Sequence, residues 1–191
     1  MKLEVRFSGF GGQGIILMGY VFGKALAVHQ GLHAVLTQSY GPEARGGASA
    51  ADVVFSDQPV DYPKVRRCDI LVCMSQDAYE TYHPLLRENG MLLYDAHLVE
   101  VHVDKNEAYR FAFPATDIAD RLVKKKITAN MVMLGALCAI AGIPSREALE
   151  ESIRDSLRKE LVDLNLNAMR LGYEEARKKG YVYEIELKIP A

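Results

Sequence analysis

The segment VRFSGFGGQGIILMG, residues 5–19, constrains the fold of this chain most strongly. An apolar run breaks into four glycines within six residues and then becomes apolar again. Residues 3–8 alternate as a strand does, whereas apolar residues recur at helical spacing over 15–30, up to Gly31. We therefore expect a strand, a tight glycine loop and a helix in direct succession.

The glycine loop has the spacing of a phosphate-binding turn, because Gly9, Gly11 and Gly14 fit the pattern G-x-G-x-x-G. Glycines there permit a sharp turn and let backbone N–H groups approach an anion, which the helix N-terminus also favours. A tight turn that holds no ligand is the alternative. The loop residues we take as candidates for binding are Gly9, Gly11, Gly12, Gln13 and Gly14.

The rest of the chain alternates between short apolar runs and amphipathic stretches. Strands are expected at 32–38, 48–56, 69–74, 91–95 and 108–113, and helices within 75–90, 114–126, 127–142, 144–160 and 164–180. This alternation predicts an α/β fold: a single Rossmann-like domain with a mainly parallel sheet flanked by helices and a helical C-terminal part. We expect one domain over 1–180 and an extended tail over 181–191, which could dock on a partner.

Composition narrows the class of protein. The net charge of −2 arises from interspersed acids and bases, so we expect neither nucleic-acid nor membrane binding. No apolar run reaches the roughly 20 residues of a membrane helix, and no signal-peptide pattern opens the chain, so we expect a cytoplasmic protein. The three cysteines are too few for a four-cysteine iron–sulfur cluster and are expected to be small buried side chains.

The end of the second strand argues against a plain NAD site, which needs an acidic residue there for the ribose. The strand instead ends in LTQS, residues 36–39, and continues into the loop SYGPEARGG. We consider three roles for this loop: contact with a phosphate, a subunit interface, or an internal salt bridge between Glu43 and Arg45. Its candidate binding residues are Tyr40, Arg45, Gly46 and Gly47.

Four segments in fixed order carry a resemblance: FSGFGGQG, TQSYGPEARGGASAADVVFS, CDILVCMSQDAYE and TANMVMLGAL. Together they resemble the gamma subunits of the 2-oxoacid:ferredoxin oxidoreductases, in particular those of the 2-oxoglutarate synthase branch. The similarity covers roughly residues 3–175. A glycine loop alone is common, but its combination with SYGPEARGG about 25 residues later is highly specific.

The resemblance implies membership of a complex that converts a 2-oxoacid, coenzyme A and oxidised ferredoxin into acyl-CoA, carbon dioxide and reduced ferredoxin. In that family thiamine diphosphate and its Mg²⁺ lie between alpha and beta chains, with iron–sulfur clusters on the beta chain or a ferredoxin-like delta chain. No catalytic residue is assigned to this chain, which is expected to be inactive alone. The glycine loop and Arg45 are expected either to contact coenzyme A phosphates or to dock onto the alpha chain.

Two rival functions remain open on the sequence. One is an autonomous NADP-dependent reductase, supported by the glycine loop and Arg45, and the other is a non-enzymatic adaptor. A pyruvate, 2-oxoisovalerate or indolepyruvate enzyme of the same family is a further possibility. Asp95 and His97 resemble an acid–base pair but have no nucleophile beside them, Ser75 is expected to cap a helix, and Asn130 to support a loop end.

Overall fold

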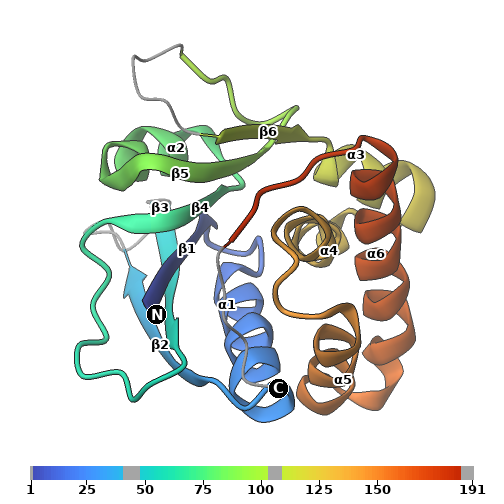
Figure 1. Ribbon diagram of the computed structural model, residues 1–191. Helices are drawn as coiled ribbons and strands as arrows, with labels where there is room; N and C mark the ends of the chain where they lie inside the picture. The colour runs from blue at the N-terminus through green and yellow to red at the C-terminus, as the bar shows by residue number, and fades with distance from the viewer. Residues whose placement is uncertain (1, 41–47, 103–108, 186–191) are drawn as a thin grey trace.

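A computed structural model describes residues 2–40, 48–102 and 109–185. Its centre is a six-stranded sheet in the order β2-β3-β1-β4-β5-β6 (Figure 1). The strands are β1 Lys2–Phe10, β2 His33–Tyr40, β3 Ala48–Ser56, β4 Cys68–Cys73, β5 Leu86–Asp95 and β6 Tyr109–Phe113. The expected α/β fold with a mainly parallel sheet is confirmed.

One strand departs from the parallel arrangement. β3 pairs antiparallel with both β1 and β2, so it runs against its neighbours while β1 and β2 point the same way. The connection from β2 to β3 covers only 41–47, which is too short for the crossover that a parallel strand requires. The chain therefore turns back at this edge, and β3 is inserted between β1 and β2.

The helices divide unequally between the two faces of the sheet (Figure 1). One face carries most of them, while the other face carries only α2 among the helices of the described residues. The helices are α1 Ile15–Lys24, α2 Gln76–Tyr82, α3 Ala115–Ile118, α4 Ala129–Ala141, α5 Arg146–Ser156 and α6 Lys159–Lys178. Within the described residues, no helix combines the length and the apolar character that crossing a membrane requires.

The core lies between the sheet and α4, in which every residue except Ala139 is buried. An added Cβ at Gly135 would collide with the main chain of Met169 in α6, and one at Gly172 with the main chain of Val132 in α4. These two glycines therefore let the helix backbones approach closely. The strongly apolar helix expected over 127–142 is thus sandwiched between the sheet and α6, as part of the same core.

Several predicted boundaries were wrong, among them the end of the helix expected over 144–160, which stops at Ser156. The helix expected to reach Asn89 and Gly90 ends at Tyr82, because Pro84 lies in a short 3₁₀ turn, His83–Leu85, after which β5 begins. β5 already pairs with β4 at Leu86, which lies opposite Cys68. A bulge follows before Met91 pairs with Ile70. The last helix begins at Lys159 rather than 164, because Arg158 already provides an extended N-cap.

The described part of the expected tail, 181–185, packs against this chain itself. The Tyr183 N–H donates to the Ile140 carbonyl at 2.8 Å, and the Tyr181 hydroxyl donates to the Ala112 carbonyl at 3.3 Å. The Tyr181 and Phe111 rings also lie in contact, with their centroids 5.2 Å apart. Residues 186–191 of that tail lie outside the described part of the chain.

Candidate functional site

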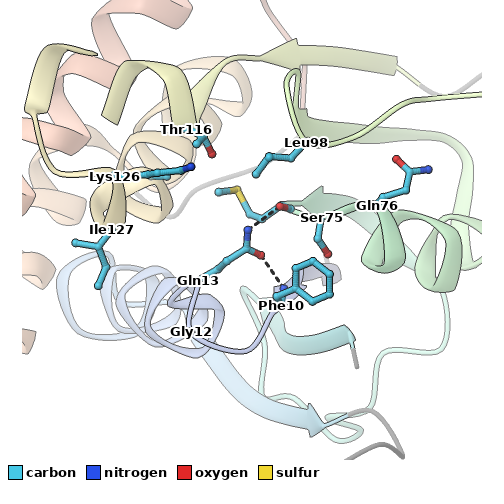
Figure 2. Close-up of a pocket in the computed structure, with 11 residues that line it drawn as sticks. Phe10, Gly12, Gln13, Ser75, Gln76, Leu98, Thr116, Lys126 and Ile127 are labelled. Atoms are coloured by element: carbon cyan, nitrogen blue, oxygen red, sulfur yellow. Dashed lines mark hydrogen bonds between the residues drawn. The ribbon is translucent and has the colours of Figure 1, made fainter. Parts of the chain in front are cut away.

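A crevice opens where two neighbouring parallel strands send the chain in opposite directions. β1 and β4 lie side by side, but β1 leads into α1 on one face and β4 leads into α2 on the other. Such a switch point, at the carboxyl edge where parallel strands end, is the usual ligand site of an open α/β sheet. Here it holds a cavity of about 550 Å³ (Figure 2). Its lining residues are Phe10, Gly12, Gln13, Met74, Ser75, Gln76, Leu98, Thr116, Lys126, Ile127 and Ala129.

Gly12 and Gln13 of the glycine loop line this cavity, whereas Gly9, Gly11 and Gly14 are not among its lining residues. Gly12 and Gly14 have φ angles of 92° and 73°, in the left-handed region that favours glycine. Gly14 is also the N-cap of α1, and its carbonyl accepts a hydrogen bond from the Asn130 side-chain amide at 3.3 Å. Asn130 thus supports the loop end, as expected.

The Gln13 side chain holds the loop in place (Figure 2). Its Oε1 accepts a hydrogen bond from the Phe10 N–H at 2.7 Å, and its Nε2 donates to the Met74 carbonyl at 2.9 Å. A Cβ at Gly9 would collide with this same Oε1, so Gly9 leaves room for the Gln13 amide. These bonds leave one Nε2 hydrogen and one Oε1 lone pair for any ligand.

Much of the rest of the lining comes from residues that sequence reasoning did not select. Phe10, Leu98 and Ile127 line the cavity with 39%, 38% and 76% of their surfaces exposed, which is unusual for large apolar side chains grouped together. Lys126 also reaches into this space (Figure 2). The available signal was an isoleucine directly after three lysines, in a connection that follows the last strand.

The lining of the cavity carries a single positive charge. Lys126 is the only charged residue among the lining residues, and it forms no ion pair within the described ranges. Asp95 lies beneath this edge, fully buried, and its carboxylate accepts bonds from the N–H groups of Thr116 at 2.8 Å and His97 at 3.0 Å. Asp95 therefore fixes the turns around the site, and the cavity presents a positive and apolar surface.

The second candidate loop begins and ends at the same edge of the sheet. Tyr40 pairs with Ser49, which pairs with Gly9, and the Ser49 hydroxyl donates to the Gly9 carbonyl at 3.1 Å. Arg45, Gly46 and Gly47 lie outside the described residues, so their role stays a prediction. Because β3 intervenes, β2 ends two strand spacings, about 10 Å, from β1. The position that usually recognises a dinucleotide ribose is displaced accordingly.

The three cysteines are buried and unpaired, as expected. Burial raises the pKa of the Cys68, Cys73 and Cys138 thiols to about 12. Among the residues that the structure describes, no group of three His, Cys, Asp or Glu side chains is placed to hold a metal ion. Ser75, the other residue expected to have a structural role, caps α2 by accepting the Ala78 N–H at 3.3 Å.

The fold and the crevice define the class: an α/β domain with a cavity at its switch point. The chain belongs to the pyruvate ferredoxin/flavodoxin oxidoreductase family, whose model matches residues 4–175. The family resemblance carried by the four sequence segments is thereby confirmed.

Known proteins match this chain over nearly its whole length. The 2-oxoglutarate synthase subunit KorC of Methanocaldococcus jannaschii is 48% identical, over 93% of this chain and 96% of the relative. The keto/oxoacid ferredoxin oxidoreductase gamma subunit of Geobacter sulfurreducens PCA superposes with a TM-score of 0.84, at 39% identity, covering 93% of this chain and 98% of that one.

A third match is with part of a longer chain. The 2-oxoglutarate:ferredoxin oxidoreductase of Magnetococcus marinus, solved with 2-oxoglutarate, coenzyme A and succinyl-CoA bound, gives a TM-score of 0.81 at 25% identity. The match covers 93% of this chain but only 31% of that chain. The same domain thus occurs both as a separate polypeptide and within a larger one.

Proposed function

We propose that this chain is the gamma subunit of a 2-oxoglutarate:ferredoxin oxidoreductase, which forms succinyl-CoA and carbon dioxide while reducing ferredoxin. The observation that carries this proposal is the 48% identity with KorC, because it extends over 96% of that subunit. The complete domain, rather than a shared motif, is therefore held in common.

In this proposal the chain is a subunit that assembles and binds rather than reacts. Alpha and beta chains, with a delta chain in some complexes, carry thiamine diphosphate, Mg²⁺ and iron–sulfur clusters, and ferredoxin accepts the electrons in the cytoplasm. The Magnetococcus chain supports this arrangement, because the matching domain makes up only 31% of it. The rest of that longer chain corresponds to partners that this chain meets as separate polypeptides.

Coenzyme A is the ligand that we assign to the carboxyl edge. The glycine loop offers the N–H groups of the exposed Gly11 and Gly12, and Arg45 belongs to a loop whose two ends lie at this edge. Both features suit phosphate groups. They equally suit docking of the alpha chain, and the two roles are separable by experiment.

The experiment is the substitution Arg45→Ala in the complex reconstituted with its partner chains. A raised KM for coenzyme A with intact assembly supports phosphate contact, whereas loss of co-purification supports docking. Arg67→Ala is the matched control, because Arg67 is an exposed arginine just before β4, at the opposite edge. If Arg45→Ala changes neither property, both roles fail for this residue.

The reductase alternative makes a different prediction for the isolated chain. Stoichiometric binding of NADP(H), measured by titration calorimetry, supports an autonomous reductase and contradicts our proposal. The displaced end of β2 argues against it, because β3 separates β2 from the glycine loop. A purely structural adaptor predicts instead that no cavity variant changes the KM for coenzyme A.

A further inference from the structure

A second groove lies at the amino edge of the sheet, where the parallel strands β1, β4 and β5 begin. Its volume is about 520 Å³, and we call it the basic groove after its lining residues, Glu4, Tyr62, Lys64, Arg66, Arg67 and Arg87. β1 spans nine residues, so the two ends of the strand, and with them the basic groove and the crevice, lie about 30 Å apart. The basic groove is therefore separate from the site described above.

The acids around the basic groove already have cationic partners. The Glu4 carboxylate lies 3.2 Å from Lys2 Nζ and 3.3 Å from Arg87 Nη2. The Asp69 carboxylate lies 2.7 Å from Arg87 Nη1 and also accepts the Glu4 N–H at 2.8 Å. The charges of Lys2 and Arg87 are thus matched by those of Glu4 and Asp69.

The other three cations of the basic groove keep their charge. Lys64, Arg66 and Arg67 are all exposed, and no carboxylate of the described residues forms an ion pair with them. The arginines of α5 and the neighbouring part of α6 differ, because acids neutralise them: Arg146, Arg154 and Arg170 all pair with Glu150. The positive charge at the amino edge is therefore a local excess in a chain whose net charge is −2.

Tyr62 holds part of this charge in place at the surface. The Arg66 guanidinium donates to the Tyr62 hydroxyl at 3.3 Å and lies 5.4 Å from the centre of its ring. Lys2 Nζ donates to the Tyr62 carbonyl at 3.2 Å and lies 5.9 Å from the same ring. An aromatic ring fixes a cation without neutralising it, so the charge stays available to an anionic partner.

We infer that the basic groove attracts a carboxylate-rich face of ferredoxin, through Lys64, Arg66 and Arg67. The inference rests on the proposed function, which it deepens by giving this subunit a role towards the electron acceptor. Electrons still leave from an iron–sulfur cluster on a neighbouring chain, because the three cysteines of this chain are too few to hold one.

The exposure of these cations favours a transient protein partner. The cores of permanent interfaces are depleted in charged residues, whereas exposed charges at a surface mainly raise the rate of encounter and select the partner. In the proposed reaction ferredoxin is the protein that must bind and leave at each turnover. The alpha and beta chains, by contrast, stay in the complex.

The position of the basic groove agrees with this role. Coenzyme A and the alpha chain are assigned to the carboxyl edge, so the amino edge, about 30 Å away along β1, is left for a partner that comes and goes. The effect expected of such a surface is on the second-order rate constant for ferredoxin, kcat/KM, and on its dependence on salt. The kcat itself, which is set by chemistry and electron transfer on other chains, should not change.

The test uses the assembled complex and a double charge reversal. The variant is Lys64→Glu with Arg66→Glu, and the control is Arg158→Glu with Lys159→Glu, which changes the net charge equally at exposed positions outside the basic groove. Reduction of ferredoxin is measured from about 0.02 M to about 0.5 M ionic strength, over which the Debye length falls from roughly 20 Å to roughly 4 Å. Methyl viologen serves as a second electron acceptor that needs no protein docking.

We expect kcat/KM for ferredoxin to fall about tenfold in the variant at low ionic strength and to approach the unmodified value at high ionic strength. The KM for coenzyme A and the rate of methyl viologen reduction should stay unchanged, and the control should behave as the unmodified complex does. The dye rate shows that the variant complex is assembled and active.

A second measurement needs no variant. A carbodiimide joins carboxylates to nearby lysine amines without a spacer, so we treat the unmodified complex with ferredoxin and this reagent and locate the joined residues by mass spectrometry. Cross-links from ferredoxin to Lys64 support the inference, and cross-links confined to lysines outside the basic groove overturn it.

The contrary kinetic outcomes separate this inference from the proposed function. A value of kcat/KM for ferredoxin equal to that of the control at every ionic strength overturns the inference and leaves the gamma-subunit function intact. Loss of co-purification in the variant alone also overturns it, because the basic groove is then a permanent interface. Failure of the unmodified complex to reduce ferredoxin with 2-oxoglutarate and coenzyme A overturns the proposed function itself.

Discussion

The Gln13 side-chain amide donates a hydrogen bond to the Met74 carbonyl, 2.9 Å away, and so joins the two loops that leave the sheet towards opposite faces. The oxygen of the same amide accepts a hydrogen bond from the Phe10 N–H at 2.7 Å. One residue thus fixes the width of the crevice and the position of an apolar residue in its wall. This side chain therefore links the two sides of the proposed binding site.

We predict that Gln13→Ala lowers the free energy of unfolding by about 1–2 kcal/mol, because two main-chain groups lose their partners. The KM of the assembled complex for coenzyme A is expected to rise as well, since the two loops are no longer joined. Urea unfolding and steady-state kinetics of the complex measure these changes. Gln58→Ala is the control, because Gln58 is exposed and lies outside the cavity. Equal stability of the two variants contradicts the role given to Gln13.

Gly14 is the glycine whose replacement is expected to cost most within the loop. Its φ is 73°, and a Cβ would collide with the Asn130 side-chain amide. Gly14→Ala should therefore lower the free energy of unfolding by about 2–4 kcal/mol, through backbone strain and crowding. At Gly11 an added Cβ meets nothing within 4 Å, so Gly11→Ala should change stability little. The comparison fails if thermal unfolding shows the same loss for both.

The buried thiols predict a loss of stability at alkaline pH. Each folded thiol keeps its proton up to a pKa of about 12. An unfolded thiol loses it above about 8.5, so ionisation favours the unfolded state as pH rises. The free energy of unfolding should fall by up to about 1.4 kcal/mol per pH unit for each thiol between these values.

Thiol reactivity provides the direct measurement. In the native chain at pH 8 we expect almost no reaction of the cysteines with a disulfide reagent, and three reactive thiols after denaturation. A Cys68→Ser, Cys73→Ser, Cys138→Ser triple variant serves as the control for the alkaline slope. Rapid labelling of the native protein would contradict the burial described above.

The tail residue Tyr181 is expected to stabilise the edge of the sheet. Its ring contacts Phe111, and its hydroxyl donates to the Ala112 carbonyl at 3.3 Å. Tyr181→Ala should lower the free energy of unfolding by about 1–2 kcal/mol, because it uncovers apolar surface on β6. Val182→Ala is the neighbouring control, since Val182 is 66% exposed. Equal effects of the two substitutions would show that this part of the tail adds no stability.

Much of the fold could be predicted because local patterns and tertiary structure agree. The strand expected at 48–56 has the bounds of β3, and Gly11, Gly12 and Gly14 do connect β1 to α1, whereas Gly9 still belongs to β1. The direction in which the strands pair was harder to predict from the sequence, since nothing in β3 itself specifies that it runs antiparallel. That direction follows from the short connection between Tyr40 and Ala48.

Only one wall of the candidate site could be predicted from the sequence. The glycine loop carries its own signature, so the wall around Gly12 and Gln13 was identified in advance. Leu98 and Ile127 come from separate connections and meet only because β4, β5 and β6 are parallel and end at one edge. No local pattern marks such residues, because their proximity is a consequence of the topology.

The most direct test of the account measures 2-oxoglutarate- and coenzyme A-dependent reduction of ferredoxin, with the chain alone and after assembly with its partner chains. We predict no turnover by the isolated chain and turnover by the assembled complex. Turnover by the isolated chain, or a complex that keeps full activity at the same coenzyme A concentration without this subunit, would contradict the account.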